Sequence, residues 1–207
     1  MNNKDYWQKY YSTNYKPTSK SGFAEFVMPY LKKANNLLEL GCGNGRDCIY
    51  FSSNGIKCVG VDQISEEIDF LNRNFSNNNL KFVCDDFTDI KEKTLLDTHF
   101  DYIYSRFTFH SIDEKNEDKT LKWISQYLND GMLFVEARSI NDAMYLEGKR
   151  ISENENFTNH YRRYITLDTF IQKLKSLGFE ILYKKEDNNL AKYKNDNPYV
   201  IRVIAAK

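Results

Sequence analysis

LLELGCGNGRD, residues 37–47, joins an apolar run to a turn with glycines at alternate positions, Gly41, Gly43 and Gly45. Glycine allows the positive φ angles and the close backbone approach that such a turn needs. A helix that starts after the turn would point its unpaired N–H groups at a bound ligand. The stretch therefore predicts a nucleotide-type cofactor site at the carboxyl end of a strand.

The spacing of the glycines distinguishes two classes of cofactor. The dinucleotide fingerprint has glycines at its first, third and sixth positions, whereas the sixth position here is Arg46. Glu39, two residues before the first glycine, followed by G-x-G-x-G, resembles motif I of the class I S-adenosylmethionine-dependent methyltransferases. The resemblance implies that S-adenosylmethionine is the cofactor and that it is bound by Glu39, Gly41, Gly43 and Gly45.

Two further strand ends carry acids in the order that this resemblance requires. Asp62 follows the apolar run 56–61, and an acid at this place can hydrogen-bond a ribose diol. Asp86 follows the run 80–84, and the resemblance implies that it contacts the adenine amino group. Asp85 takes that place instead if the strand register slips by one residue. The list of expected cofactor-binding residues is completed by Phe87 and Ser105.

Helical and strand-like segments alternate along the chain, which predicts a parallel sheet with crossover helices. We expect Pro29 to divide the first helix and Gly178 to cap the last one. The resemblance implies an α/β, Rossmann-like class I methyltransferase sheet of order 3-2-1-4-5-7-6, with helices on both faces and one antiparallel strand. The predicted strands cover 36–40, 56–61, 80–84, 99–105, 131–137, 179–187 and 198–206. The predicted helices cover 22–33, 45–54, 65–75, 116–128 and 166–177.

Composition favours one compact enzyme domain over residues 1–207. The 29 basic and 29 acidic residues balance, so no overall field recruits nucleic acid or an acidic membrane. We find no apolar signal core at the start and no apolar run of membrane-spanning length, and we expect a cytoplasmic protein. The four cysteines form no C-x-x-C pair, so we interpret them as reduced core thiols and expect no metal.

Two segments lie outside the regular pattern, and we expect them to determine the substrate. Residues 1–33 begin with closely spaced aromatic residues that would share one helical face. This helix either packs across the sheet or forms a lid over the cofactor. Residues 138–165 form an insertion rich in cations, with Arg138 just past a strand end. Such a cluster suits an anionic substrate or serves as a solvated basic loop.

The alternation of side chains in an extended segment limits which cations can face a substrate. His160 and Arg162 would share one side of the chain, and Tyr161 and Arg163 the other. The sequence alone leaves the choice between the pairs open, so we assign substrate binding to His160, Arg162 and Arg163 together with Arg138.

His110 is the candidate general base, because it follows the fourth predicted strand and imidazole titrates near neutrality. A core or capping histidine is the alternative. Arg106 either binds substrate or pairs with Asp101. For an alcohol acceptor His110 should act as a base, whereas for an acceptor oxygen that is already anionic it would donate a hydrogen bond.

The glycine motif, the strand-end acids, the segment 105–111 and the run 160–163 together resemble small bacterial methyltransferases of capsule and surface-polysaccharide synthesis. This resemblance implies O-methylation of a small anionic metabolite, carrying a phosphoryl, phosphoramidate or carboxylate group, or of a sugar. It leaves a homodimer open. The alternatives are a non-catalytic S-adenosylmethionine-binding module or partner subunit and, less favoured, an NAD-dependent reductase that uses Tyr145 and Lys149.

Overall fold

The computed structural model describes residues 3–128, 130–193 and 195–207. Its contacts divide the chain into two compact units, Met1–Tyr104 and Ser105–Lys207. Among the described residues, none of the helices has the length and the apolar composition needed to span a membrane.

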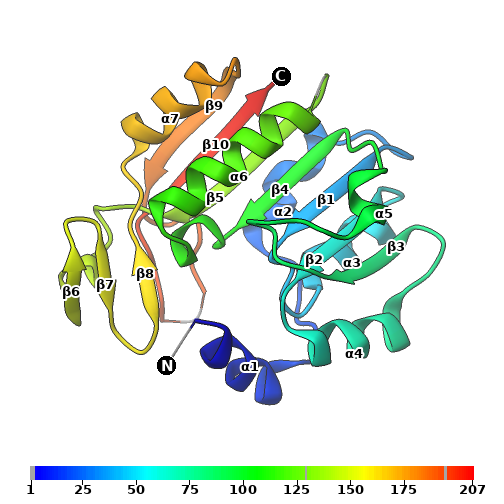
Figure 1. The fold of residues 1–207 in the computed structure, drawn as a ribbon, viewed down its shortest axis with the longest axis horizontal. Coiled ribbons are helices and arrows are strands. Elements are labelled where there is room, and N and C mark those ends of the chain that lie inside the picture. The colour runs from blue at the N-terminus through cyan, green and yellow to red at the C-terminus, as the bar shows by residue number, and fades with distance from the viewer. Residues whose placement is uncertain (1–2, 129, 194) are drawn as a thin grey trace. The chain divides into compact units, whose positions relative to one another are not determined.

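The first unit is built on parallel strands that alternate with helices (Figure 1). Strand β1 pairs with β2, and β2 pairs with β3, all in parallel register. The apolar run before the glycine turn is buried along β1, which explains why it forms a central strand. The strands are β1 (Asn36–Leu40), β2 (Lys57–Asp62) and β3 (Leu80–Cys84). The helices are α1 (Asn3–Asn14), α2 (Gly22–Val27), η1 (Met28–Tyr30), α3 (Arg46–Ser53), α4 (Ser65–Phe75) and α5 (Lys93–Leu96).

A buried polar network joins helix α3 to two other segments of the first unit. The Asp47 carboxylate accepts hydrogen bonds from the Ser21 N–H at 2.7 Å and the Ser21 hydroxyl at 2.7 Å. The Tyr104 hydroxyl donates to the same carboxylate at 2.9 Å. The Tyr104 ring packs against Phe23 and Phe51. Because buried carboxylates need such partners, this network fixes α3 directly behind the glycine turn.

The second unit ends in an antiparallel arrangement (Figure 1). Strand β10 pairs antiparallel with both β5 and β9. A separate three-stranded sheet has the order β6-β7-β8. The strands are β5 (Met132–Arg138), β6 (Lys149–Ser152), β7 (Glu155–Phe157), β8 (Tyr161–Arg163), β9 (Glu180–Asp187) and β10 (Val200–Ala206). The helices are η2 (Phe109–Ser111), α6 (Glu114–Tyr127), η3 (Ala143–Leu146) and α7 (Leu167–Ser176).

Strand β4 (Tyr102–Arg106) contains the boundary between the units. Hydrogen bonding orders the long strands as β3-β2-β1-β4-β5-β10-β9. Numbered along the chain, this is the predicted order 3-2-1-4-5-7-6 with one antiparallel strand, so the predicted fold class is confirmed.

Local predictions hold with small shifts at the element ends. Pro29 lies in η1, directly after α2, so the predicted division of the first helix is confirmed. Gly178 has φ +83° directly after α7, as a left-handed cap requires. The predicted strand 99–105 was too long at its start, since β4 begins at Tyr102. Helix α5 and the β6-β7-β8 sheet were not predicted as regular elements, because both consist of segments of only three or four residues.

Candidate functional site

The glycine turn of the first unit has the backbone that the sequence predicts. Gly41, Gly43 and Gly45 have φ angles of 64°, 52° and 71°, in the left-handed region where glycine is favoured. Gly45 is the residue before α3, which begins at Arg46. The turn thus leads directly from a buried strand to a helix N-terminus, which is the geometry of a nucleotide-type site.

Asp62 ends β2 beside this turn. Its Oδ2 accepts the Gly43 N–H at 3.0 Å, and its Oδ1 accepts the Ile64 N–H at 3.1 Å. Burial raises the pKa of Asp62, and the backbone N–H groups partly offset this effect. These two bonds fix the Asp62 carboxylate between the glycine turn and the start of α4.

Glu39 lies buried on β1 and faces a group of thiols. The Cys48 thiol donates to Glu39 Oε2 at 2.9 Å. Burial raises the pKa of Cys48 and raises that of Cys42 to about 12, so both remain protonated at neutral pH. The cysteines are free thiols, as predicted, and Cys42, Cys48 and Cys58 are buried. Cys84 is exposed, so its assignment to the core was wrong.

The two acids after β3 have different environments. Asp85 Oδ2 accepts the N–H groups of Lys91 and Glu92 at 2.8 and 2.7 Å, so its carboxylate closes a loop. Asp86 is exposed, and its Oδ1 accepts the N–H and hydroxyl of Thr88. The Asp86 carboxylate is therefore more accessible than that of Asp85. Phe87 follows it and is half-buried.

Helix α1 carries the aromatic face predicted for the N-terminus. Trp7 stacks with Tyr11 at 6.1 Å between ring centroids, and the Gln8 amide donates to Glu66 at 2.8 Å. The Tyr11 hydroxyl lies where a Cβ at Gly43 would stand, so a larger residue at that position would displace the Tyr11 side chain. The helix is confirmed, and its contact with the glycine turn supports the lid interpretation.

His110 is the centre of a second group of side chains, within the second unit. It lies buried in η2, and its Nδ1 accepts the Arg138 N–H at 3.3 Å. Burial lowers its pKa well below 6.5, and the charges of Arg138 and Arg162 lower it further. His110 is therefore neutral at physiological pH and lies among arginines.

The backbone at Phe107 is strained in a way that the sequence did not reveal. Its φ of 60° is unusual for a residue with a large side chain. Its half-buried ring lies 4.2 Å from the Arg106 guanidinium carbon, 5.9 Å from that of Arg138 and 5.2 Å from the His110 ring centroid. Such strain gathers at functional sites. Here it brings an aromatic face to two cations and a histidine.

The arginines of this group are held by buried carboxylates. Arg106 Nε bonds Glu136 Oε1 at 3.0 Å, so its partner is Glu136 rather than the Asp101 considered from the sequence. Arg202 bonds the other oxygen of Glu136 at 2.6 Å. Arg138 binds both oxygens of Asp142 at 3.0 and 2.9 Å. These ion pairs fix the positions of the guanidinium groups.

Along β8 the side chains of Arg162 and Arg163 have different surroundings, as the alternation of an extended chain predicts. His160 and Arg162 are buried, and both act on the pKa of His110. Arg163 instead forms a buried ion pair with Glu117, and its Nε donates to the Ile112 carbonyl at 3.2 Å. Arg162, not Arg163, thus joins the His110 group.

The other predicted positions have structural partners. Ser105 is fully buried and its hydroxyl is hydrogen-bonded to Thr108. The Tyr145 hydroxyl donates to the Glu153 carbonyl at 2.9 Å, while Lys149 is exposed on β6. In the described residues, no cluster of three histidine, cysteine or acidic side chains offers a metal site.

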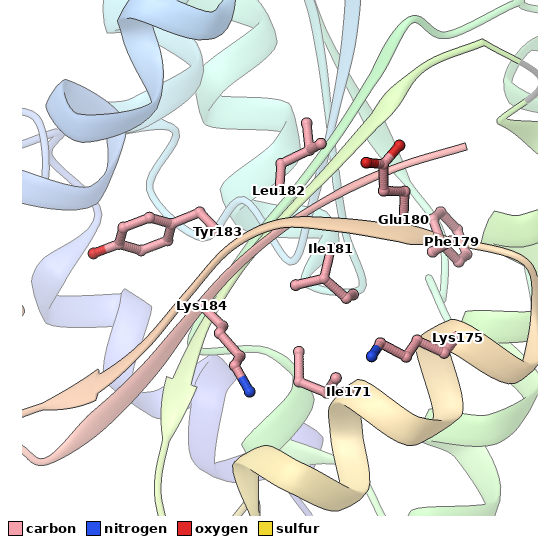
Figure 2. Close-up of a pocket in the computed structure, with 8 residues that line it drawn as sticks. All are labelled: Ile171, Lys175, Phe179, Glu180, Ile181, Leu182, Tyr183 and Lys184. Atoms are coloured by element: carbon pink, nitrogen blue, oxygen red, sulfur yellow. The ribbon is translucent and has the colours of Figure 1, made fainter.

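A pocket of about 430 Å³ lies elsewhere in the second unit, between α7 and β9 (Figure 2). Its walls come from Ile171 and Lys175 of α7 and from the segment 179–184. None of the predicted site residues lines it, so we do not assign the site there.

Sequence reasoning missed three contributors to these groups. Phe107 gave no signal, because its positive φ depends on tertiary structure. Asp142 could have been found as an acid four residues after Arg138, although the spacing is not helical here. Glu67 of α4, buried beside Asp62, looked like an ordinary charge on a helix surface.

Comparisons with known proteins agree with this geometry. A solved S-adenosylmethionine-dependent methyltransferase from Methanosarcina mazei has a TM-score of 0.73 at 19% identity, covering 88% of this chain and 96% of that one. The glycopeptide N-methyltransferase MtfA, complexed with S-adenosylhomocysteine, has a TM-score of 0.68 at 14% identity, covering 92% and 91%. The 1,6-didemethyltoxoflavin-N1-methyltransferase of Burkholderia thailandensis, solved with bound 1,6-didemethyltoxoflavin and S-adenosylhomocysteine, has a TM-score of 0.68 at 16% identity, covering 89% of this chain and 76% of that one.

At these identities the likenesses establish the fold, which this chain shares with S-adenosylmethionine-dependent methyltransferases. Among curated protein sequences there is no significant match. The family model described as a methyltransferase domain matches residues 13–184. Because that match spans most of the chain, this protein belongs to the methyltransferase domain family.

Proposed function

We propose that this protein is an S-adenosylmethionine-dependent methyltransferase that methylates an anionic oxygen of a small acceptor. The acceptor would carry a phosphoryl, phosphoramidate or carboxylate group, or be a sugar bearing one, and would belong to surface-polysaccharide synthesis. The family match supports methyl transfer. The arginines around the neutral His110 in the second unit support the anionic acceptor.

The first unit offers residues that fit the cofactor. The glycine turn has no side chain of its own at Gly43, where the Tyr11 hydroxyl of α1 now lies, and the Asp62 carboxylate beside it suits a ribose diol. We assign the adenine end to Asp86 and Phe87. Glu39 supports the turn indirectly, because it accepts a hydrogen bond from the Cys48 thiol of α3. When bound, S-adenosylmethionine supplies a methyl group on a sulfonium that is already a good leaving group.

The bond between Arg138 and His110 is the observation that carries the choice of acceptor. A neutral imidazole has one N–H and one lone pair in the ring plane. Because Nδ1 accepts the Arg138 N–H, the proton lies on Nε2, which can donate but not accept. A general base acting through Nε2 would need the other tautomer. His110 therefore suits an acceptor oxygen that is already negative, to which it donates a hydrogen bond.

The reaction needs no base with such an acceptor. The acceptor oxygen forms a bond to the methyl carbon, the carbon–sulfur bond breaks, and its electron pair stays on sulfur. Arg162 and His110 would bind and orient the anion, while Arg138, whose guanidinium is already paired with Asp142 and Asp196, would position His110 through its backbone N–H. Orientation of this kind can supply most of the rate, since well-aligned reactions reach effective molarities on the order of 10⁵ M or more. We retain Arg162 in this role and give Arg163, already paired with Glu117, the lesser part.

Methyl transfer to a panel of acceptors tests the proposal. Purified protein and methyl-labelled S-adenosylmethionine are incubated with a sugar phosphate, a sugar phosphoramidate, a sugar acid and the matching neutral sugar. Label should enter the anionic acceptors and not the neutral one. Arg162→Met should raise the KM for the anion, whereas Arg150→Met, which removes an exposed arginine, should leave it unchanged. Transfer to the neutral sugar alone would contradict the anionic acceptor, and cofactor binding without any transfer would favour a non-catalytic binding module.

A further inference from the structure

Glu67 is a buried acid in the first unit that no step above uses. It lies in the first turn of α4 and is 3% exposed. Its Oε1 is buried and has no hydrogen-bond partner within the described ranges of the chain. A buried polar atom without a partner destabilises the fold, so its presence requires an explanation.

The direction of Glu67 follows from the packing of its helix. Leu71 lies one turn further along α4, and residues four apart share a helix face. The Leu71 methyl groups lie 3.0 and 3.1 Å from where a Cβ at Gly45 would stand. This face of α4 is thus packed on the glycine turn, and Glu67 lies on the same face.

Charge effects locate Glu67 next to the other groups at the turn. Burial raises its pKa to about 7, and the neighbouring Asp62 carboxylate adds to the shift. Asp62 and Glu67 both raise the pKa of Tyr11, whose hydroxyl lies against Gly43. Side chains from β2, α4 and α1 therefore meet at one place, where Asp62 is assigned to the ribose.

We infer that Glu67 is a further cofactor-binding residue, whose Oε1 accepts a hydrogen bond from a donor of the bound cofactor beside the Asp62 carboxylate. The inference rests on the proposed function. The donor is a ribose hydroxyl or the α-ammonium group, since both can bond a carboxyl oxygen. A purely structural residue here would be apolar, because methionine fills a similar volume without a polar atom to satisfy.

Three variants separate binding from structure. Glu67→Met removes the acceptor, Glu67→Gln keeps a carbonyl oxygen that can accept, and Asp69→Asn removes an exposed charge from the same helix as a control. Binding of S-adenosylhomocysteine is measured by calorimetry, and the melting temperature is measured without ligand. Glu67→Met should lose about tenfold in affinity, roughly one hydrogen bond. Its melting temperature should not fall, and the other two variants should stay within about threefold of wild type.

A second ligand identifies the donor. 5′-Methylthioadenosine has the ribose hydroxyls but no ammonium group. An equal loss for both ligands in Glu67→Met identifies a ribose hydroxyl, and a loss for S-adenosylhomocysteine alone identifies the ammonium group. If Glu67→Met does not fold, Glu67→Ala provides the same comparison.

The role of Glu67 and the proposed function can be refuted independently of each other. Unchanged affinity in Glu67→Met, with wild type binding normally, refutes the role of Glu67 and leaves the proposed function intact. Failure of the wild-type protein to bind S-adenosylhomocysteine refutes the proposed function itself.

Discussion

The backbone N–H of Arg138 donates to Nδ1 of His110 over 3.3 Å, and this bond determines which ring nitrogen carries the proton. The resulting N–H on Nε2 makes His110 a donor toward any ligand at that edge. Because burial and nearby arginines lower the pKa of His110 well below 6.5, it stays neutral from pH 6 to 8. The rate of methyl transfer should therefore not change with pH in this range, whether His110 acts as a general base or as a hydrogen-bond donor. Another measurement must separate the two roles.

Substitution of His110 makes that separation through kcat and KM. The acceptor oxygen loses negative charge as it bonds to the methyl carbon, so a donor to it acts mainly on binding. We predict that His110→Phe raises the acceptor KM about tenfold, roughly the worth of one hydrogen bond to a charged group, and changes kcat little. Steady-state kinetics with the best anionic acceptor measure both constants. His110→Gln, which keeps a donor, should be closer to wild type. A fall of about 10²–10⁴ in kcat would indicate a general base instead.

Substitution of Arg163 by methionine should mainly lower stability, whereas the same substitution at Arg162 should mainly weaken acceptor binding. Arg163→Met leaves the buried Glu117 carboxylate with one ion-pair partner fewer, and breaking a buried pair costs about 3–5 kcal/mol. Lys173, which also bonds Glu117 at 2.9 Å, reduces that loss, so we expect about 2–3 kcal/mol less stability by urea denaturation. Arg162→Met should change stability less and raise the acceptor KM. Loss of stability in Arg162→Met alone would reverse the assignment.

The Asp47 network should contribute measurably to the stability of the first unit. Tyr104→Phe removes one of three hydrogen bonds to the Asp47 carboxylate and keeps the ring packing. We predict a loss of about 1.5–3 kcal/mol in the free energy of unfolding, as is usual for a hydrogen bond to a charged group. Urea denaturation with an unchanged m value checks it. Tyr15→Phe, at a more exposed tyrosine, is the control, and equal effects of the two changes would contradict the network.

Stability without cofactor should depend on pH through Glu67. Its pKa is about 7 in the folded protein and near 4.5 in the unfolded chain. Between these values the folded state holds more protons, so the contribution of Glu67 to stability falls as pH rises from 4.5 to 7. The difference amounts to about 3 kcal/mol at most, at 1.36 kcal/mol per pKa unit.

Comparison with Glu67→Gln isolates this effect from other titrations. The variant lacks the titrating carboxyl, while Asp62 and Tyr11 remain. Its stability relative to wild type, measured by urea denaturation, should therefore be greater at pH 8 than at pH 5. A constant difference at the two pH values would show that Glu67 is not held as a buried acid.

The sequence predicted the features that depend on local chemistry. Gly41, Gly43 and Gly45 could be recognised because glycine alone readily takes the positive φ angles of this turn. The strand order followed from the resemblance. Strand alternation predicted that Arg162 and Arg163 lie on opposite sides of the chain, and Arg163 pairs with Glu117. In each case the information lies within a few neighbouring residues or in a motif.

The remaining features depend on contacts between residues far apart in the chain. Nothing near Glu67 or Asp47 in sequence shows that these acids are buried, since both lie in the first turns of helices where exposed acids are common. The partner of Arg106 is thirty residues away at Glu136. The positive φ of Phe107 is likewise set by tertiary structure, since its N–H donates to the Glu136 carbonyl at 2.8 Å.

The most direct test of the central claim is calorimetric titration of the purified protein with S-adenosylmethionine, S-adenosylhomocysteine and NAD in parallel. We expect saturable binding of the first two ligands, no binding of NAD, and at least about a tenfold loss of affinity in Asp62→Ala, roughly the worth of its hydrogen bonds to the ribose. Because Asp62 also accepts the Gly43 and Ile64 N–H groups, circular dichroism must show that the variant is folded. Binding of NAD alone, or undiminished binding by folded Asp62→Ala, would contradict the account.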